Sequence, residues 1–132
     1  MEFKIKNLMK SPLVTTVKTA TIDYVRELME RKKIQAIPII KDINNLKIEG
    51  IITSSDMRGI SDGKALVEDY MTNETYRVSI EADPEIAARI MLEEGVHHLL
   101  VEDNNQVVGM LSSLDFVRLV AEGNFKEMQF LL

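Results

Sequence analysis

Two stretches of the chain carry apolar residues at helical spacing, and they predict two amphipathic helices with one buried face each. The predicted buried positions are Ile22, Val25, Leu28 and Met29 in the first helix and Ile86, Ala87, Ile90 and Met91 in the second. Thr21 and Asp83 stand where N-caps are expected, and Pro84 suits the first helical position, where its missing N–H is harmless. The two patterns are related by a shift of 62 positions, as in Thr21 and Asp83 (83 − 21).

Strand-like segments surround each helix in the same order. A short apolar segment precedes it ("PLVTTV" or "TYRVSI"), and two apolar runs follow around an Asn-Asn turn signal. The first of these predicted hairpins is three residues longer, and we place the extra residues in its loop, where insertions cost little. A short closing helix is expected to begin near Ser54 and again near Ser113. The order β-α-β-β-α, written twice, predicts an α+β fold.

The closing segment of each copy is the most similar part of the repeat. Residues 50–57 read "GIITSSDM" and residues 109–116 read "GMLSSLDF", with a shift of 59 positions (109 − 50). We divide the chain into repeat 1, residues 1–62, and repeat 2, residues 63–132. Neither copy can cover its small sheet alone, so we expect one compact module with the repeats packed about a pseudo-twofold axis and two related clefts.

The closing segment carries residue types that can either bind a ligand or cap a helix. Thr53 and Ser112 each end a strand, and Asp56 and Asp115 follow three residues later. A carboxylate there can accept both hydroxyls of a ribose, a helix N-terminus suits a phosphate, and the preceding glycine lets backbone approach a ligand. The alternative is a plain helix cap with the aspartate as a partner of the helix dipole, and the residue chemistry alone favours this alternative.

Composition excludes several classes of protein. The 132 residues carry a net charge of −5, which gives no basic field for nucleic acid, although a local RNA-binding patch stays open. The absence of cysteine excludes thiolate metal sites and is compatible with a cytoplasmic location. We expect no membrane segment, since no apolar run approaches the roughly 18–20 residues that span a bilayer. No P-loop, nucleophile elbow or dinucleotide fingerprint occurs, so we expect no enzyme activity and no catalytic residues.

The repeated motifs resemble those of a tandem pair of CBS (cystathionine-β-synthase-type) domains, also called a Bateman module. The matching features are "LM" or "YM" opening each copy, "IPII" and "LLVE" on a central strand, and G-x-x-[ST]-x-x-D at its close, from about Asn7 to Leu119. The resemblance implies a regulatory module that binds an adenosyl ligand such as AMP, ADP, ATP, NAD or S-adenosylmethionine and signals to an unidentified partner protein. No cofactor or metal is implied.

The same resemblance implies which residues hold the ligand. Thr53, Asp56, Ser112 and Asp115 would hold the ribose of an adenosine. Candidate phosphate contacts are His97, His98, Arg58 and Arg118. Solvated surface positions are the competing interpretation for these four. The histidines favour repeat 2 as the better site, because repeat 1 has Gln35 and Ala36 at their positions.

Assembly is the last expectation. The apolar tail, residues 125–132, and the exposed faces of the helices favour a homodimer, as is common for CBS pairs. The alternative is a monomer whose tail folds back. A second functional hypothesis is a structural or interaction module that dimerises and binds no nucleotide.

Overall fold

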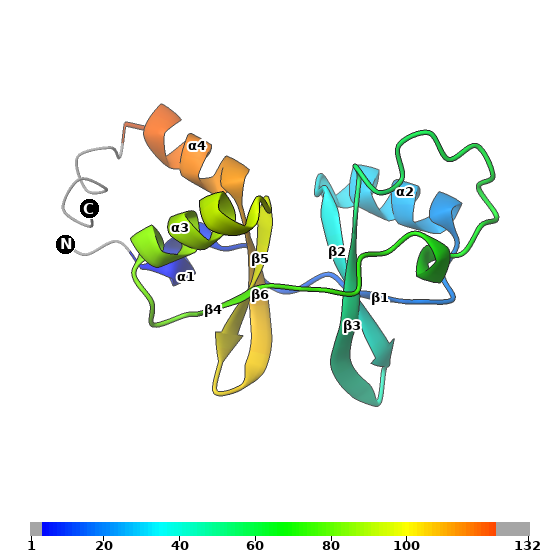
Figure 1. The fold of residues 1–132 in the computed structure, drawn as a ribbon, viewed down its shortest axis with the longest axis horizontal. Helices are drawn as coiled ribbons and strands as arrows, with labels where there is room; N and C mark the ends of the chain where they lie inside the picture. Colours follow the sequence, from blue (N-terminus) through cyan, green and yellow to red (C-terminus); the bar gives the residue numbers. More distant parts are fainter. Residues whose placement is uncertain (1–3, 124–132) are drawn as a thin grey trace. The chain divides into compact units, whose positions relative to one another are not determined.

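The computed structural model describes residues 4–123 and divides into two compact units. The first, here called the repeat 1 unit, is Val14–Thr75. The second, the repeat 2 unit, combines the N-terminal segment up to Leu13 with the chain from Tyr76 onward. Figure 1 shows a small sheet and packed helices in each unit. The apolar tail discussed above, residues 125–132, lies outside the described residues.

Both units contain a three-stranded sheet with the same order and strand directions. The central strand pairs parallel with a short strand on one side and antiparallel with a hairpin partner on the other. The repeat 1 unit contains β1 (Thr16–Val17), α2 (Ile22–Lys32), β2 (Ala36–Asp42), β3 (Asn45–Thr53) and the 3₁₀ turn η1 (Val67–Asp69). The repeat 2 unit contains α1 (Ile5–Leu8), β4 (Arg77–Ser79), α3 (Pro84–Glu94), β5 (His98–Asp103), β6 (Gln106–Ser112) and α4 (Ser113–Ala121).

The α2 helix follows the sequence pattern closely. All four predicted core positions, from Ile22 to Met29, are buried. The Thr21 hydroxyl accepts a hydrogen bond from the Tyr24 backbone N–H at 3.2 Å, which satisfies one of the unpaired donors of the first turn. Lys33 ends the helix in the left-handed conformation, with φ of 56°.

The α3 helix departs from the pattern at two positions. Ala87 and Met91 are buried and Ile90 packs against the core, but Ile86 is exposed, so its prediction as a core residue was wrong. A helix of 3.6 residues per turn places Ile86 beside the buried stripe, and only packing decides which side is covered. Asp83 occupies the N-cap position, yet its side chain makes no capping hydrogen bond.

The extra residues of the first hairpin lie in its strands, and their predicted place in the loop was wrong. Both hairpins turn through two residues, between Asp42 and Asn45 and between Asp103 and Gln106. The strands β2 and β3 hold 7 and 9 residues, whereas β5 and β6 hold 6 and 7. The longer hairpin also has a second break in register, so the insertion is absorbed as strand length and a bulge.

The repeated glycines make room for neighbouring backbone. A Cβ on Gly109 would lie 2.8 Å from the Lys10 carbonyl oxygen, and one on Gly50 would lie 2.6 Å from the Thr72 carbonyl oxygen. In both cases the adjacent strand residue exchanges two backbone hydrogen bonds with that neighbouring segment. The expectation that these glycines admit a ligand is therefore corrected, because what approaches each of them closely is the protein's own chain.

The closing helix forms in one repeat only. After β6, residues Ser113–Ala121 form α4, as predicted. After β3, residues 54–59 form successive turns instead, so the helix predicted to begin near Ser54 is wrong. Gly59 adopts a φ of 83° there, which an α-helix cannot accommodate, and that interrupts the segment after a single turn.

Candidate ligand-binding site

In the repeat 1 unit, Asp56 is held by one of its two carboxylate oxygens. Its Oδ2 accepts a hydrogen bond from the Thr53 backbone N–H at 2.9 Å. In return, Thr53 Oγ1 accepts one from the Asp56 backbone N–H at 3.2 Å. The other oxygen, Oδ1, has no hydrogen-bond partner within residues 4–123, and the side chain is half-buried. Asp56 is thus fixed in place with one strong acceptor unused.

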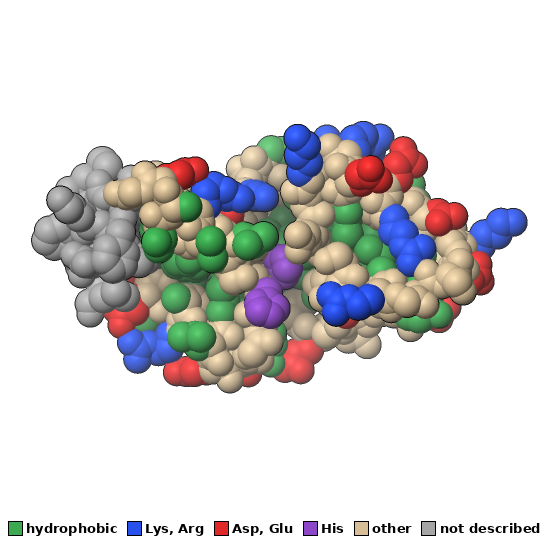
Figure 2. Space-filling view, turned by 90° about the horizontal axis from the view of Figure 1, so that it is seen from above, with side chains coloured by type: hydrophobic (Ala, Val, Ile, Leu, Met, Phe, Trp, Pro, Cys, Tyr) green, Lys and Arg blue, Asp and Glu red, His purple; other side chains and the backbone are tan. Residues whose placement is uncertain are grey.

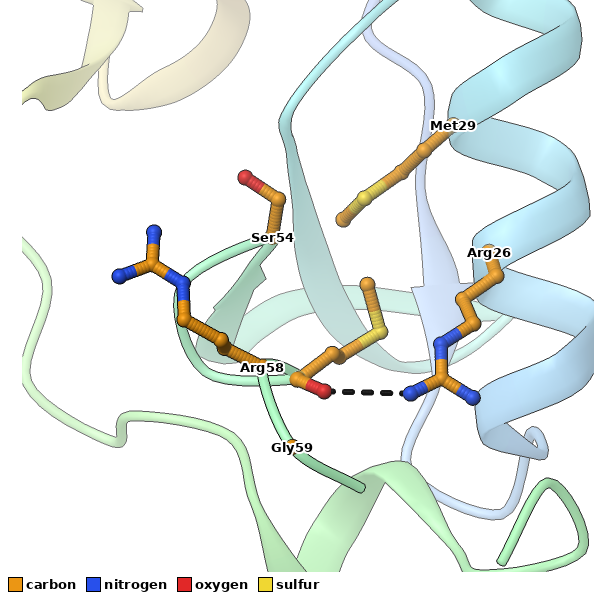
Figure 3. Close-up of a pocket in the computed structure, with 6 residues that line it drawn as sticks. Arg26, Met29, Ser54, Arg58 and Gly59 are labelled. Atoms are coloured by element: carbon orange, nitrogen blue, oxygen red, sulfur yellow. Dashed lines mark hydrogen bonds between the residues drawn. The ribbon is translucent and has the colours of Figure 1, made fainter. Parts of the chain in front are cut away.

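A hollow of about 430 Å³ opens beside this turn. It is lined by Arg26, Met29, Ser54, Met57, Arg58 and Gly59, all within the repeat 1 unit. Figure 3 shows Arg26 and Met29 reaching in from α2, while Ser54, Arg58 and Gly59 come from the turn after β3. Methionine side chains supply an adaptable apolar wall, and the arginines supply positive charge, so the lining suits a ligand with a flat apolar part and an anionic part.

Arg26 secures the turn that replaces the missing helix. Its guanidinium donates hydrogen bonds to the carbonyl oxygens of Met57 at 3.2 Å and Ile60 at 2.5 Å. The dashed line in Figure 3 marks the first of these, and Arg58 points away from Arg26. Because Met57 is buried in the core, this clamp ties the turn to α2 on one side and to the core on the other. Arg58 is exposed and makes no ion pair within the described residues.

In the repeat 2 unit the corresponding aspartate is fully engaged. Asp115 Oδ2 accepts hydrogen bonds from the Ser112 backbone N–H at 2.7 Å and the Ser112 hydroxyl at 3.2 Å. Its Oδ1 accepts one from Arg118 at 2.9 Å, which is also a salt bridge. The Asp115 side chain is 1% exposed, whereas that of Arg118 is 48% exposed. Both carboxylate oxygens of this buried acid are therefore occupied by the protein itself.

The two histidines differ in their surroundings. His97 is exposed, and its Nδ1 lies 3.4 Å from the Ser113 hydroxyl oxygen. His98 begins β5 and is half-buried. Burial lowers the pKa of His98 below its ordinary value, with smaller contributions in the same direction from the positive charges of His97 and Lys10 and an opposing one from Asp115. A histidine that favours the neutral form is a weaker phosphate ligand than the sequence pattern suggested.

The repeats differ at the position that follows each aspartate by three residues. The shift of 59 that pairs Asp56 with Asp115 also pairs Gly59 with Arg118 and Arg58 with Val117. The two arginines proposed from sequence as phosphate contacts are therefore not equivalent. Arg118 is bonded to its aspartate, and Arg58 is not. Repeat 1 has no side chain at the position from which Arg118 reaches Asp115.

Sequence reasoning missed Arg26 and Met29 as residues of this site. Met29 was assigned to the core, and it is indeed buried there while it also lines the hollow. The sequence did contain an indication for Arg26. It lies three residues before the buried Met29, so the two side chains are neighbours on one face of the helix, and a face that only packs against the core would not require an arginine. Within residues 4–123, no group of three or more His, Cys, Asp or Glu residues is placed to hold a metal ion. No helix in that range has the length and apolar character to cross a bilayer.

Comparison with known proteins identifies the family. The family model described as CBS domain matches residues 5–63 and again 67–122. The chain therefore belongs to the CBS domain family and is a pair of such domains, as the resemblance implied. This is a family of regulatory modules.

Similar proteins extend this picture. An inosine-5′-monophosphate dehydrogenase from Streptococcus pyogenes is 34% identical over 101 residues, which is 75% of this chain and 20% of the dehydrogenase. The chain thus spans about a fifth of that relative's length. The CBS domain pair of protein MJ0100, solved in complex with 5′-methylthioadenosine and S-adenosyl-L-methionine, is 25% identical with a TM-score of 0.79, covering 89% of this chain and 99% of that one. A hexameric CBS-CP12 protein from bloom-forming cyanobacteria is 21% identical with a TM-score of 0.76, over 87% of this chain and 69% of that one.

Proposed function

We propose that this CBS domain pair is a ligand-sensing regulatory module that binds an adenosine-containing compound at Asp56. The observation that carries the proposal is the carboxylate itself, fixed by Thr53 through one oxygen and unbonded at the other within the described chain. Such an acceptor suits the vicinal hydroxyls of a ribose. Support for the ligand class comes from the MJ0100 pair, whose bound compounds both contain adenosine.

The remaining residues have proposed roles around the same ligand. Arg58 is exposed near the turn and is the candidate contact for a phosphate or another anion in repeat 1. Ser112 and Asp115 are the candidate ribose contacts of repeat 2, with Arg118, His97 and His98 as candidate anion contacts. We now rank repeat 1 first, because Asp56 has an unused oxygen and Asp115 does not.

The ligand class is tested by mass spectrometry of the protein purified under native conditions. We expect an adenosine-containing compound to co-purify with the wild-type chain. The candidates are AMP, ADP, ATP, methylthioadenosine and S-adenosylmethionine. Asp56→Ala removes the free acceptor and is expected to weaken binding by about 1.5–3 kcal/mol, as for a hydrogen bond to a charged group. Thr53→Val removes only the Thr53 hydroxyl, so it measures the contribution of the hydroxyl apart from that of the carboxylate. Unchanged calorimetric affinity in both variants would reject this site.

A second function is favoured by a separate observation, the apolar exposed face of α4. Leu114 and Val117 are 50% and 60% exposed, and Val120 continues the same stripe. Figure 2 shows apolar side chains gathered on the surface of the repeat 2 unit. We therefore propose that the chain assembles into a homodimer through its helices, and that the assembly transmits ligand binding to a partner protein in the cytoplasm. A pure interaction module would keep this assembly and bind no nucleotide.

A further inference from the structure

The two repeats present their aspartates in opposite states. Asp56 has one unbonded carboxylate oxygen, while Asp115 has both oxygens occupied and is almost completely buried. The difference traces to a single position, because Arg118 donates to Asp115 Oδ1 and its counterpart Gly59 has no side chain to do so. The same motif is therefore open in repeat 1 and closed in repeat 2.

We infer that Arg118 closes the repeat 2 site against uncharged adenosyl compounds and admits those that carry a phosphate. The inference rests on the proposed function, since it concerns the ligand class of the second aspartate. Arg118 is thus a specificity-determining residue. Its guanidinium stays bonded to Asp115 unless the ligand carries an anionic group to which the guanidinium can bond instead.

The energetic reason is an exchange of hydrogen bonds. The Asp115 side chain is 1% exposed, so a ribose hydroxyl reaches Oδ1 only after the Arg118 guanidinium moves aside. A bond between two charged groups is then replaced by one with a single charged partner. Without further compensation that exchange is unfavourable. A phosphate on the same ligand accepts the released guanidinium, often through two parallel hydrogen bonds, so the charge-assisted bond is kept and the ribose contact is gained.

The geometry of the pair permits this exchange. The Arg118 side chain is 48% exposed, so it can turn toward solvent, whereas the buried Asp115 is held in place by two bonds from Ser112. The ion pair lies three residues apart on one helix, an arrangement that contributes modestly to stability. When Arg118 turns away, Asp115 keeps its two bonds from Ser112. Removing Arg118 altogether leaves a buried carboxylate with one partner fewer, so stability in urea is measured beside ligand choice.

The repeat 1 site has no arginine bonded to its aspartate. With Gly59 at the matching position, Asp56 Oδ1 is available at once, and Arg58 is already free of any ion pair in the described chain. Repeat 1 accordingly admits uncharged adenosyl compounds without first breaking an ion pair, and Arg58 remains the candidate phosphate contact for phosphorylated ones. Two sites on one chain then respond to different ligands.

The test measures by calorimetry how tightly the full chain binds AMP and 5′-methylthioadenosine. Both contain the adenine and the ribose, but AMP carries a phosphate where methylthioadenosine carries an uncharged methylthio group. Asp56→Ala is introduced first, so that the signal comes from repeat 2. In this background we expect AMP to bind at least about tenfold more tightly than methylthioadenosine, the loss of one charge-assisted bond. Adding Arg118→Ala should weaken AMP and strengthen methylthioadenosine, so that their affinity ratio approaches one.

Matched variants separate selectivity from stability. Arg89→Ala removes another helical arginine of the same unit, which pairs with Glu85 on α3, and it should leave the ratio unchanged. Arg118→Lys keeps the charge without the forked geometry and should give an intermediate ratio. If Arg118→Ala lowers stability in urea, the affinity ratio can still be measured in Arg118→Lys.

The outcomes distinguish this inference from the proposed function. If the ratio is the same with and without Arg118, or if neither compound binds the Asp56→Ala chain in either form, the inference is overturned while binding at Asp56 stands. If the wild-type chain binds neither compound, the proposed function fails and the inference fails with it.

Discussion

Replacing Arg26 with alanine tests how repeat 1 holds its aspartate turn without a closing helix. The Arg26 guanidinium bonds two carbonyl oxygens, of Met57 and Ile60, that no helix satisfies. A hydrogen bond from a charged donor contributes about 1.5–3 kcal/mol. One nitrogen serves both carbonyls and the pair is only partly buried, so we expect the free energy of unfolding to fall by about 1–3 kcal/mol in total.

Urea denaturation of the full chain, followed by circular dichroism, measures this change. Arg31→Ala is the matched control, since Arg31 is an exposed residue on the same helix. It should change the free energy of unfolding by less than about 0.5 kcal/mol. Adenosyl affinity at Asp56 should also fall in Arg26→Ala, because the turn that carries Asp56 loses its tie to α2. If Arg26→Ala proves as stable as the control and binds ligand as tightly, the clamp has no positioning role.

Three further predictions concern other parts of the chain. Gly109→Ala places a Cβ 2.8 Å from the Lys10 carbonyl oxygen and should cost about 1–3 kcal/mol of unfolding free energy in urea, so an unchanged midpoint would contradict the close approach. The lowered pKa of His98 means that folding favours its neutral form. Its contribution is therefore present above the unfolded pKa of 6.5 and lost as pH falls through the lower folded value, so urea midpoints should decline as pH falls from about 7.5, less so in His98→Gln. Val117→Glu puts a charge on the exposed α4 stripe and should convert the proposed dimer to a monomer in light scattering, whereas an unchanged mass would move the interface elsewhere.

The sequence predicted the repeated architecture well because local patterns determine it. Helical spacing located α2 and α3, and the Asn-Asn signals located both hairpins. Ile86 was misplaced because a helical pattern defines a stripe but not its edge, and the edge depends on tertiary packing. The missing helix after Ser54 escaped prediction for two reasons. The sequence does not show that Gly59 takes a positive φ, and the clamp from Arg26 that holds the turn comes from another element of the fold.

For the candidate site, the sequence indicated the residues but not their states. Thr53 with Asp56 and Ser112 with Asp115 pair as the motif predicts. The occupation of Asp115 by Arg118 required a side-chain conformation that spacing alone leaves open, since an arginine three residues on can equally face solvent. The preference for repeat 2 rested on two histidines and did not take account of this bond.

The central claim is that Asp56 is the ribose acceptor of an adenosyl-binding module, and calorimetric titration of the wild-type chain and Asp56→Ala with AMP tests it most directly. We predict saturable binding to the wild-type chain and a loss of affinity at one site of about tenfold or more in Asp56→Ala, while the urea midpoint stays close to that of the wild type. Identical isotherms for the two proteins, or no heat of binding from the wild-type chain, would contradict the account.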